Sequence, residues 1–202
     1  MLQTHTVVPE LMELLKKIMS EKLFSDFNLA GGTSLALQMG HRTSIDIDLF
    51  GNSEINFELF IEKLSEYGEV KVAQSTKNIL ITKINNVKVD FVNYKYPFLT
   101  DCLFEDNIRM ASKTDIAAMK LNAIAGRGSK KDFIDLYFLL NEFSLSEILS
   151  FYDQKFSDGS IFMVQKSLTY FEYADFQLQP KMFLDFDWEN CKQKIIEEVI
   201  KL

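Results

Sequence analysis

Hydrophobic and polar positions follow two different periodic patterns along the chain, and the pattern changes near residue 110. Before it, apolar residues at every second position predict strands, set between stretches with helical spacing. After it, apolar residues recur every three or four positions, which predicts helices alone. The expected fold class is α+β, with a mixed sheet flanked by helices over residues 1–110 and a helical half over residues 111–202.

The two patterns predict the individual strands and helices. Asn85 and Asn86 tolerate positive φ and predict a tight turn between two strands. The expected strands are 27–30, 43–50, 70–74, 78–84 and 87–93. The expected helices are 8–23, 56–67, 115–125, 130–143, 146–155, 160–171 and 188–200. A further helix is expected to begin with residues 33–38.

Composition narrows the class of protein. The chain has 202 residues, of which 47% are hydrophobic and 25% charged, as in ordinary globular domains. No apolar run approaches the roughly 20 residues that cross a bilayer, and no signal peptide is recognisable. The two cysteines are far apart and have no metal-ligand spacing. We therefore expect a cytoplasmic protein with no membrane association.

A net charge of −7 does not give the overall positive field of a protein that binds nucleic acid mainly through phosphates. A local basic surface remains compatible with that charge. The candidate residues are Lys113, Lys120, Arg127, Lys130 and Lys131. A solvated helix face is an equally good interpretation of the same residues.

Asp46 and Asp48 carry the first chemical signal. They are one residue apart in a predicted strand, so both carboxylates lie on one face with their Cα atoms about 6.5 Å apart. Hard divalent cations such as Mg²⁺ need oxygen ligands, and two ions can clamp the attacking and leaving oxygens of a phosphoryl transfer. An Asp-x-Asp pair also occurs on surface strands by chance and in glycosyltransferases.

A glycine pair lies just upstream, where a strand is expected to run into a helix. Gly31 and Gly32 allow close approach to the backbone, and the N–H groups of a helix start suit phosphates. Thr33 or Ser34 adds a hydroxyl donor, and Arg42 can grip a phosphate with two hydrogen bonds. An ordinary turn with Thr33 as N-cap is the alternative.

Asp90 is a third carboxylate with apolar neighbours on a predicted strand. Alone it is a structural or surface acid about as often as a functional one. With Asp46 and Asp48 it predicts a two-metal site that includes a base for an incoming hydroxyl.

These residues resemble a known family. The segments Leu29–Leu37 and Gly40–Phe50 resemble the AbiEii/AbiGii-type toxin nucleotidyltransferases of the polymerase-β-like superfamily, over about residues 25–140. The resemblance implies that Gly31, Gly32 and Thr33 cradle the nucleotide phosphates. It also implies a nucleotidyltransferase-like sheet, metal ligands Asp46, Asp48 and Asp90, and a helical domain that completes the active-site cleft.

The segments around Lys120 and around Asp132 and Asp135 resemble the downstream lysine and Asp-x-x-Asp motifs of the family. A lysine at this point can neutralise charge that develops on the transferring phosphates. Asp132 or Asp135 then orients Lys120 or acts on the acceptor. The alternative is an interhelical salt bridge with a helix N-terminal acid.

The implied activity is transfer of a nucleoside monophosphate from an NTP to a hydroxyl acceptor, with two Mg²⁺ ions. The family also implies RNA, particularly tRNA, as acceptor, a cognate antitoxin, and a role as the toxin of a toxin–antitoxin or abortive-infection system in phage defence. The alternatives are a non-catalytic nucleotide- or protein-binding module and a glycosyltransferase, although the latter leaves the glycine pair and Asp90 unexplained.

Overall fold

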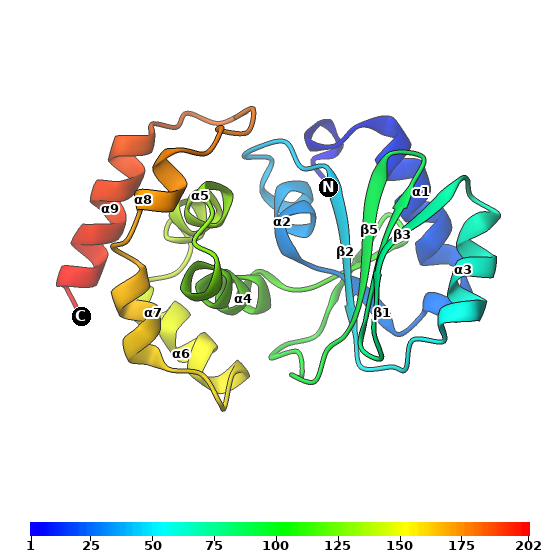
Figure 1. Ribbon diagram of the computed structural model, residues 1–202. Helices are drawn as coiled ribbons and strands as arrows, with labels where there is room; N and C mark the ends of the chain where they lie inside the picture. Colours follow the sequence, from blue (N-terminus) through cyan, green and yellow to red (C-terminus); the bar gives the residue numbers. More distant parts are fainter. The chain divides into compact units, whose positions relative to one another are not determined.

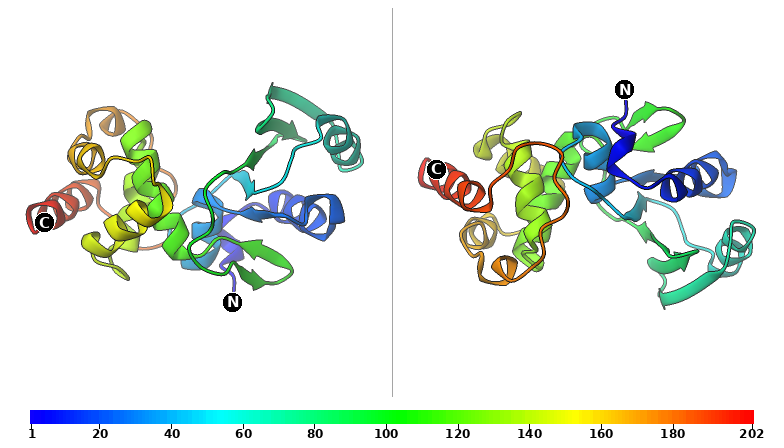
Figure 2. Two further views of the ribbon diagram at one scale, coloured as in Figure 1. Left: turned by 90° about the horizontal axis from the view of Figure 1, so that it is seen from below. Right: turned by 90° about the horizontal axis from the view of Figure 1, so that it is seen from above.

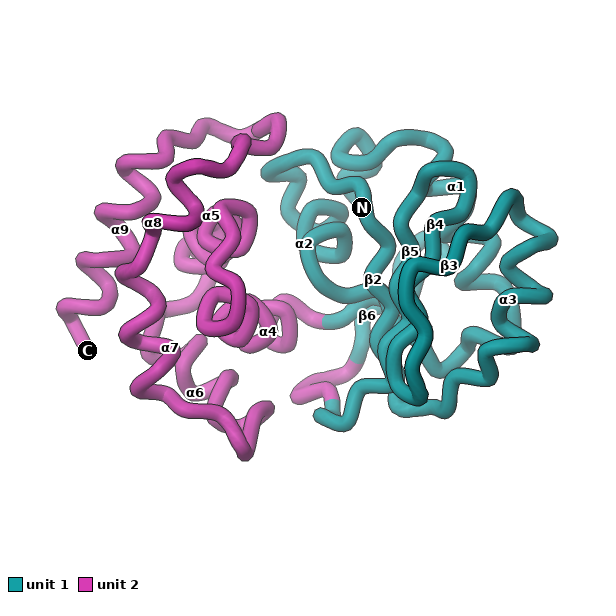
Figure 3. Tube along the Cα trace, in the orientation of Figure 1, with its two compact units in different colours: residues 1–97, 102–111 teal, residues 98–101, 112–202 magenta.

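The computed structural model describes residues 1–202, and the chain divides into two compact units (Figure 3). Unit 1 comprises Met1–Pro97 with Cys102–Ala111, and unit 2 comprises Phe98–Asp101 with Ser112–Leu202. All strands belong to unit 1, whereas unit 2 contains only helices and loops. The predicted α+β class is confirmed. None of the helices has the length and apolar character needed to cross a bilayer.

One seven-stranded mixed sheet organises unit 1 (Figure 1). Its strands follow the order β3-β4-β5-β2-β1-β7-β6. β2 is parallel to β5 and β1 to β7, and the other neighbours are antiparallel. The strands are β1 (Phe27–Leu29), β2 (Asp46–Gly51), β3 (Val70–Ser75), β4 (Ile79–Ile84), β5 (Val87–Asn93), β6 (Leu103–Glu105) and β7 (Ile108–Met110).

Three α-helices accompany the sheet in unit 1. They are α1 (Pro9–Ser20), α2 (Gly31–Met39) and α3 (Phe57–Ser65), with single 3₁₀ turns at Thr4–Thr6 and Lys22–Phe24. α1 starts with proline at its first position, where the missing N–H costs nothing. α2 starts two residues earlier than expected and ends, as predicted, at Gly40 in the left-handed conformation.

A hydrophobic core closes one face of the sheet. Phe24, Phe27, Phe60 and Phe91 pack with ring centroids 5.0–5.8 Å apart, mostly edge to face. Such pairs contribute about 0.5–1.5 kcal/mol beyond the area they bury. Because side chains alternate along a strand, the residues between these inward positions project from the opposite face, which is partly exposed.

The start of β2 differs from the prediction. The strand begins at Asp46 instead of Thr43, and Ile45, expected to point inward, is 68% exposed. The preceding Ser44 is bound elsewhere, since its N–H donates to the carbonyl of Thr6 at 2.9 Å. The chain therefore joins the sheet only at the first aspartate.

Two of the three hairpin turns of the sheet use asparagine or aspartate at positive φ. Asn85 and Asn86, at φ 45° and 78°, join β4 to β5 as predicted. Asp106 and Asn107, at φ 51° and 64°, join β6 to β7, a hairpin that the sequence did not predict. Each of its strands has three residues, too few to establish an alternating pattern.

Unit 2 consists of helices alone (Figure 2). α9 has the predicted bounds, and the predicted helix 160–171 was too long, because α7 ends at Ser167. The prediction of helix 130–143 was also too long, since α5 passes into turns after Leu139. The helices are α4 (Lys113–Gly126), α5 (Lys130–Leu139), α6 (Leu145–Lys155), α7 (Ile161–Ser167), α8 (Glu172–Asp175) and α9 (Trp188–Ile200).

A buried ion pair fixes the segment Phe98–Asp101 to the helices of unit 2. Lys155 Nζ lies 2.7 Å from Asp115 Oδ1, and neither side chain has exposed surface. The Asp115 carboxylate also accepts hydrogen bonds from Leu99 N at 2.8 Å and Ser112 Oγ at 2.9 Å. These contacts explain why a segment that precedes β6 belongs with the helices.

Candidate functional site

The three candidate metal ligands lie on two adjacent strands of unit 1. β2 and β5 are parallel, with Asp48 opposite Asp90 and Asp46 opposite Lys88. The alternate residues of both strands, such as Ile47 and Val89, are fully buried in the core. All three carboxylates therefore project from the other, partly exposed face of the sheet, as the period-two pattern predicted for Asp46 and Asp48.

The glycine turn packs directly against this acidic face. The N–H of Ala30 donates to the carbonyl of Asp48 at 2.9 Å, and Gly31 follows at φ +64°. A Cβ at Gly31 would lie 2.9 Å from Asp48 Oδ2, closer than real Cβ contacts. Glycine is required here both by the backbone conformation and by the approach of the carboxylate.

Arg42 covers the second glycine. A Cβ at Gly32 would lie 2.5 Å from Arg42 Nη2, so any other residue here would displace the guanidinium from its present position. Arg42 is almost fully buried and donates from Nη1 to the carbonyl of Thr43 at 2.9 Å. The structure thus brings Arg42 to the start of α2, where a phosphate contact was predicted for it.

The hydroxyls of Thr33 and Ser34 are buried and hydrogen-bonded within unit 1. Thr33 Oγ1 lies 2.7 Å from Ser44 Oγ and donates to the carbonyl of Asp46. Ser34 Oγ accepts from Gln38 Nε2 at 3.0 Å. Thr33 lies inside α2 and is not its N-cap. Its contacts fix the turn to the first residue of β2, and a phosphate contact of either hydroxyl stays a prediction.

Lys88 is a site residue that the sequence analysis missed. Its Nζ forms an ion pair with Asp90 Oδ2, while Asp90 Oδ1 is buried and has no hydrogen-bond partner. Burial lowers the pKa of Lys88, but its hydrogen bond to Asp90 and the charges of Asp90, Asp48 and Asp46 outweigh this and raise it. The alternation of β5, which puts residues 88 and 90 on one face, was the available signal.

The side-chain groups on this face can be compared with the ligands that a divalent cation requires. Carboxylate oxygens are the ligands that a hard cation prefers, and Oδ1 of Asp90 is an oxygen with no hydrogen bond within the protein. No group of three His, Cys, Asp or Glu side chains is already arranged around one point. The Lys88 ammonium sits at Asp90 instead. The residues fit a cation that completes its coordination with substrate oxygens.

Lys120 and Asp132 lie in a buried ion-pair group of unit 2. Lys120 Nζ is 3.0 Å from Asp132 Oδ1 and 2.5 Å from Asp135 Oδ2, and both carboxylates are fully buried. Arg127 donates from Nε and Nη2 to the two oxygens of Asp132, at 2.8 and 3.0 Å. Ser129 Oγ donates to Asp132 Oδ2 at 2.5 Å.

Several charges act on Asp132 at once. Burial by itself raises the pKa of the Asp132 carboxyl, but the charge of Lys120 and the hydrogen bonds of Arg127 and Ser129 hold it well below its usual range. The geometry is that of the interhelical salt bridge named as an alternative, with Asp132 in the first turn of α5. Catalytic roles for Lys120 and Asp132 stay predictions.

The basic cluster proposed from sequence is largely engaged within unit 2. Lys113 pairs with Glu142 at 2.5 Å, and the Lys130 amine lies 5.0 Å from the centre of the Trp188 ring. Lys120 and Arg127 contact Asp132, as described above. Lys113, Lys120, Arg127 and Lys130 therefore have partners in the protein, which favours structural positions for them.

Comparison with known proteins agrees with this geometry. The profile of the nucleotidyl transferase AbiEii toxin family, type IV toxin–antitoxin system, matches residues 13–199. An uncharacterised protein of Aquifex aeolicus strain VF5 is 39% identical over 195 residues, which cover 91% of each chain.

Two solved structures share the fold at low sequence identity. MenT4, a nucleotidyltransferase toxin from Mycobacterium tuberculosis H37Rv, superposes with a TM-score of 0.61 at 14% identity over 96% of this chain and 83% of its own. The antibiotic-resistance factor ANT(2'')-Ia in complex with adenylyl-2''-tobramycin gives a TM-score of 0.52 at 14% identity over 70% of this chain and 94% of its own. With Gly31 packed on Asp48, and Asp48 beside Asp90, the chain is a nucleotidyltransferase that belongs to the AbiEii toxin family.

Proposed function

We propose that this nucleotidyltransferase transfers a nucleoside monophosphate from an NTP to a hydroxyl of RNA, with tRNA as the first candidate acceptor. It acts in the bacterial cytoplasm as the toxin of a toxin–antitoxin or abortive-infection system with a cognate antitoxin. The observation that carries the proposal is the placement of Asp48 opposite Asp90, directly beside Gly31.

In this reaction the acceptor hydroxyl oxygen forms a bond to the α-phosphorus of the NTP. The bond from that phosphorus to the oxygen bridging to the β-phosphate breaks, and pyrophosphate leaves with the bonding electrons. Two Mg²⁺ ions, held by Asp46, Asp48 and Asp90, would supply charge neutralisation for the phosphates when bound. Asp90 Oδ1, buried and without a hydrogen bond, accepts the hydroxyl proton.

The chain's own groups position the nucleotide. The N–H groups at the start of α2 face anionic oxygens, because the first turn of a helix has unpaired donors. Gly31 and Gly32 let phosphates approach these donors, and Arg42 lies over Gly32 with a guanidinium suited to two phosphate oxygens. Thr33 holds the turn against the backbone of Asp46.

Labelling of RNA tests the proposal. Purified protein is incubated with total cellular RNA and each radioactive NTP in turn, with Mg²⁺ or with a chelator. We expect labelling by the wild type that requires Mg²⁺, and none by Asp48→Ala. Glu62→Gln, an exposed carboxylate on α3, is the matched control and should label normally. Labelling that persists in Asp48→Ala would exclude this site.

A further inference from the structure

Three lysines form a straight row across the exposed face of the sheet. In the strand register, Lys71 of β3 lies opposite Lys83 of β4, and Lys83 lies opposite Lys88 of β5. The next residue in the same row is Asp46 of β2. The row therefore begins at the edge strand of the sheet and ends at the first acid of the candidate metal site.

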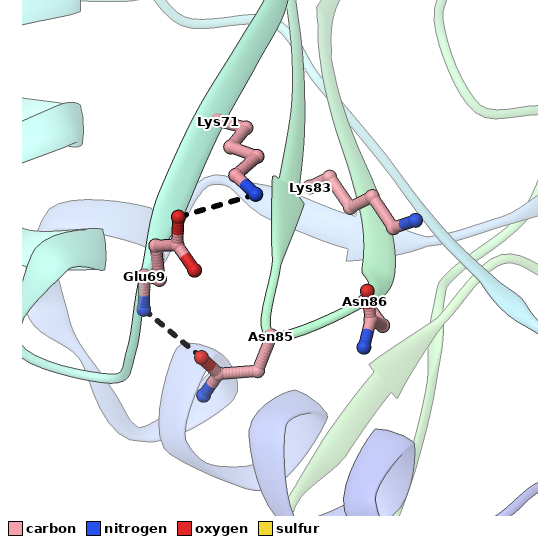
Figure 4. A pocket seen from close by; sticks show the side chains of 5 residues that line it. All are labelled: Glu69, Lys71, Lys83, Asn85 and Asn86. Atoms are coloured by element: carbon pink, nitrogen blue, oxygen red, sulfur yellow. Dashed lines mark hydrogen bonds and ion pairs between the residues drawn. The ribbon is translucent and has the colours of Figure 1, made fainter.

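The outer two lysines are available to a ligand. Lys83 is exposed and forms no ion pair, and Lys71, 71% exposed, pairs only with the equally exposed Glu69 at 3.2 Å. Both line a polar pocket of about 260 Å³ together with Glu69 and with Asn85 and Asn86 of the β4–β5 turn (Figure 4). All the residues that line this pocket are polar or charged, which favours a polar or charged ligand.

The row is unfavourable for the isolated protein. Like charges directly opposite each other on neighbouring strands destabilise a sheet, and here two such pairs are consecutive. Lysine on an edge strand prevents sheets from joining edge to edge, which accounts for Lys71 on β3. That reason does not apply to Lys83, since β4 is an interior strand, and Lys88 on β5 is already paired with Asp90. A bound polyanion relieves the repulsion at Lys83, which has no counter-ion in the protein.

We propose that Lys71, Lys83 and Lys88 bind the phosphodiester backbone of the acceptor RNA and lead its reacting end to Asp46 and Asp48. This inference rests on the proposed function and adds the surface that holds the acceptor. Neighbouring strands are about 4.8 Å apart, so the row spans roughly 10 Å from β3 to β5. Flexible lysines contact phosphates as point charges, and phosphate contacts position a nucleic acid without reading its bases.

The row of lysines also explains how a protein with a net negative charge can bind RNA. A net charge of −7 repels nucleic acid at long range, so contact must depend on a local line of cations. In unit 1 this line is continuous over three strands and ends at the acids. A polyanion bound along this line reaches the acids at the inner end of the row.

Salt-dependent RNA binding tests the inference without any need for catalysis. The double variant Lys71→Gln/Lys83→Gln is compared with wild type in filter binding to labelled tRNA at several salt concentrations, without NTP. We expect at least a tenfold loss of affinity. The slope of log affinity against log salt should fall by about 1.4, since each phosphate contact on a single strand contributes about 0.7.

Matched controls separate a specific row from general charge. Lys16→Gln/Lys22→Gln removes the same charge from exposed positions on and just after α1 and should bind RNA like the wild type. The melting temperature of Lys71→Gln/Lys83→Gln should be unchanged or higher, because like charges have been removed. Equal RNA affinity and salt slope in this variant and the wild type would overturn the inference.

Two further measurements distinguish a failure of this inference from a failure of the proposed function. Asp48→Ala should lose labelling and keep RNA binding, so a failure of either proposal is seen in its own assay. Affinity for a fluorescent NTP should be the same in Lys71→Gln/Lys83→Gln and in wild type. A variant that loses NTP affinity and keeps RNA affinity would assign the row to the nucleotide and overturn the inference.

Discussion

Replacing Asp132 by asparagine tests what the buried ion-pair group of unit 2 does. The change keeps the shape of the side chain and removes a charge that both Lys120 and Arg127 contact. Removing one partner of a buried pair costs about 3–5 kcal/mol, because the other charge stays buried without compensation. Lys120 keeps its contact with Asp135, so we expect the lower end, about 3 kcal/mol. That loss is a large fraction of the roughly 5–15 kcal/mol that stabilises a domain.

Urea unfolding followed by circular dichroism measures this loss. Asp153→Asn, the same change at an exposed position of α6, is the control and should stay within about 0.5 kcal/mol of wild type. The pKa of Asp132 is held below its usual range in the folded protein, so its charge stabilises the fold above the unfolded pKa of about 3.9. That stabilisation is lost as the pH falls below this value.

The difference between wild type and Asp132→Asn should therefore be constant from about pH 5 to 8 and shrink below about pH 4. An unfolding free energy within about 0.5 kcal/mol of wild type at pH 7 would refute the structural role. RNA labelling per folded molecule tests the catalytic prediction for Asp132 separately. A large loss in protein that is fully folded would show that Asp132 acts in the reaction as well.

Two more predictions follow from the packing of single residues. Gly31→Ala should cost about 1–3 kcal/mol in urea unfolding and reduce RNA labelling, because alanine is strained at φ +64° and its Cβ meets Asp48. Gly126→Ala, with open space at its Cβ, should be neutral or stabilising, and equal effects of the two changes would contradict this reasoning. Burial raises the pKa of the Cys191 thiol to about 12, so a thiol reagent at pH 8 should modify it only after unfolding. Rapid modification in native buffer would show that Cys191 is accessible.

Local chemistry made part of the fold predictable from sequence. Asn85 and Asn86 identify their turn because they tolerate positive φ, and the alternation of Asp46 and Asp48 with apolar residues identifies β2. Gly31 is recognisable as a required glycine only in company with the acids, since its tight contact is with Asp48. These features depend on neighbours in sequence or on short-range backbone preference.

The register of the strands could not be predicted from the sequence, and the row of Lys71, Lys83 and Lys88 depends on it. The pairing of Lys71 with Lys83 depends on the local register of β3 and β4, which shifts at an irregularity between Val72 and Gln74. No periodicity shows where such a shift falls. The parallel pairing of β2 with β5 brings Asp48 to Asp90 across 42 positions of sequence, and only the topology reveals it.

Buried charges of unit 2 are paired within the protein, whereas the exposed face of unit 1 has polar groups without partners. This difference supports the proposed ligand site on unit 1. In unit 2, Lys120 and Lys155 are buried against carboxylates that are themselves hydrogen-bonded, so these charges are already compensated. On the exposed face of unit 1, Asp90 keeps an oxygen with no hydrogen bond and Lys83 has no counter-ion. An acceptor oxygen of Asp90 and the charge of Lys83 thus remain without partners on one face, which costs stability in the free protein. A ligand that offers anionic phosphates to the lysines and arrives with a cation for the acids would satisfy both groups, as the proposed combination of a metal-bound nucleotide with an RNA strand does.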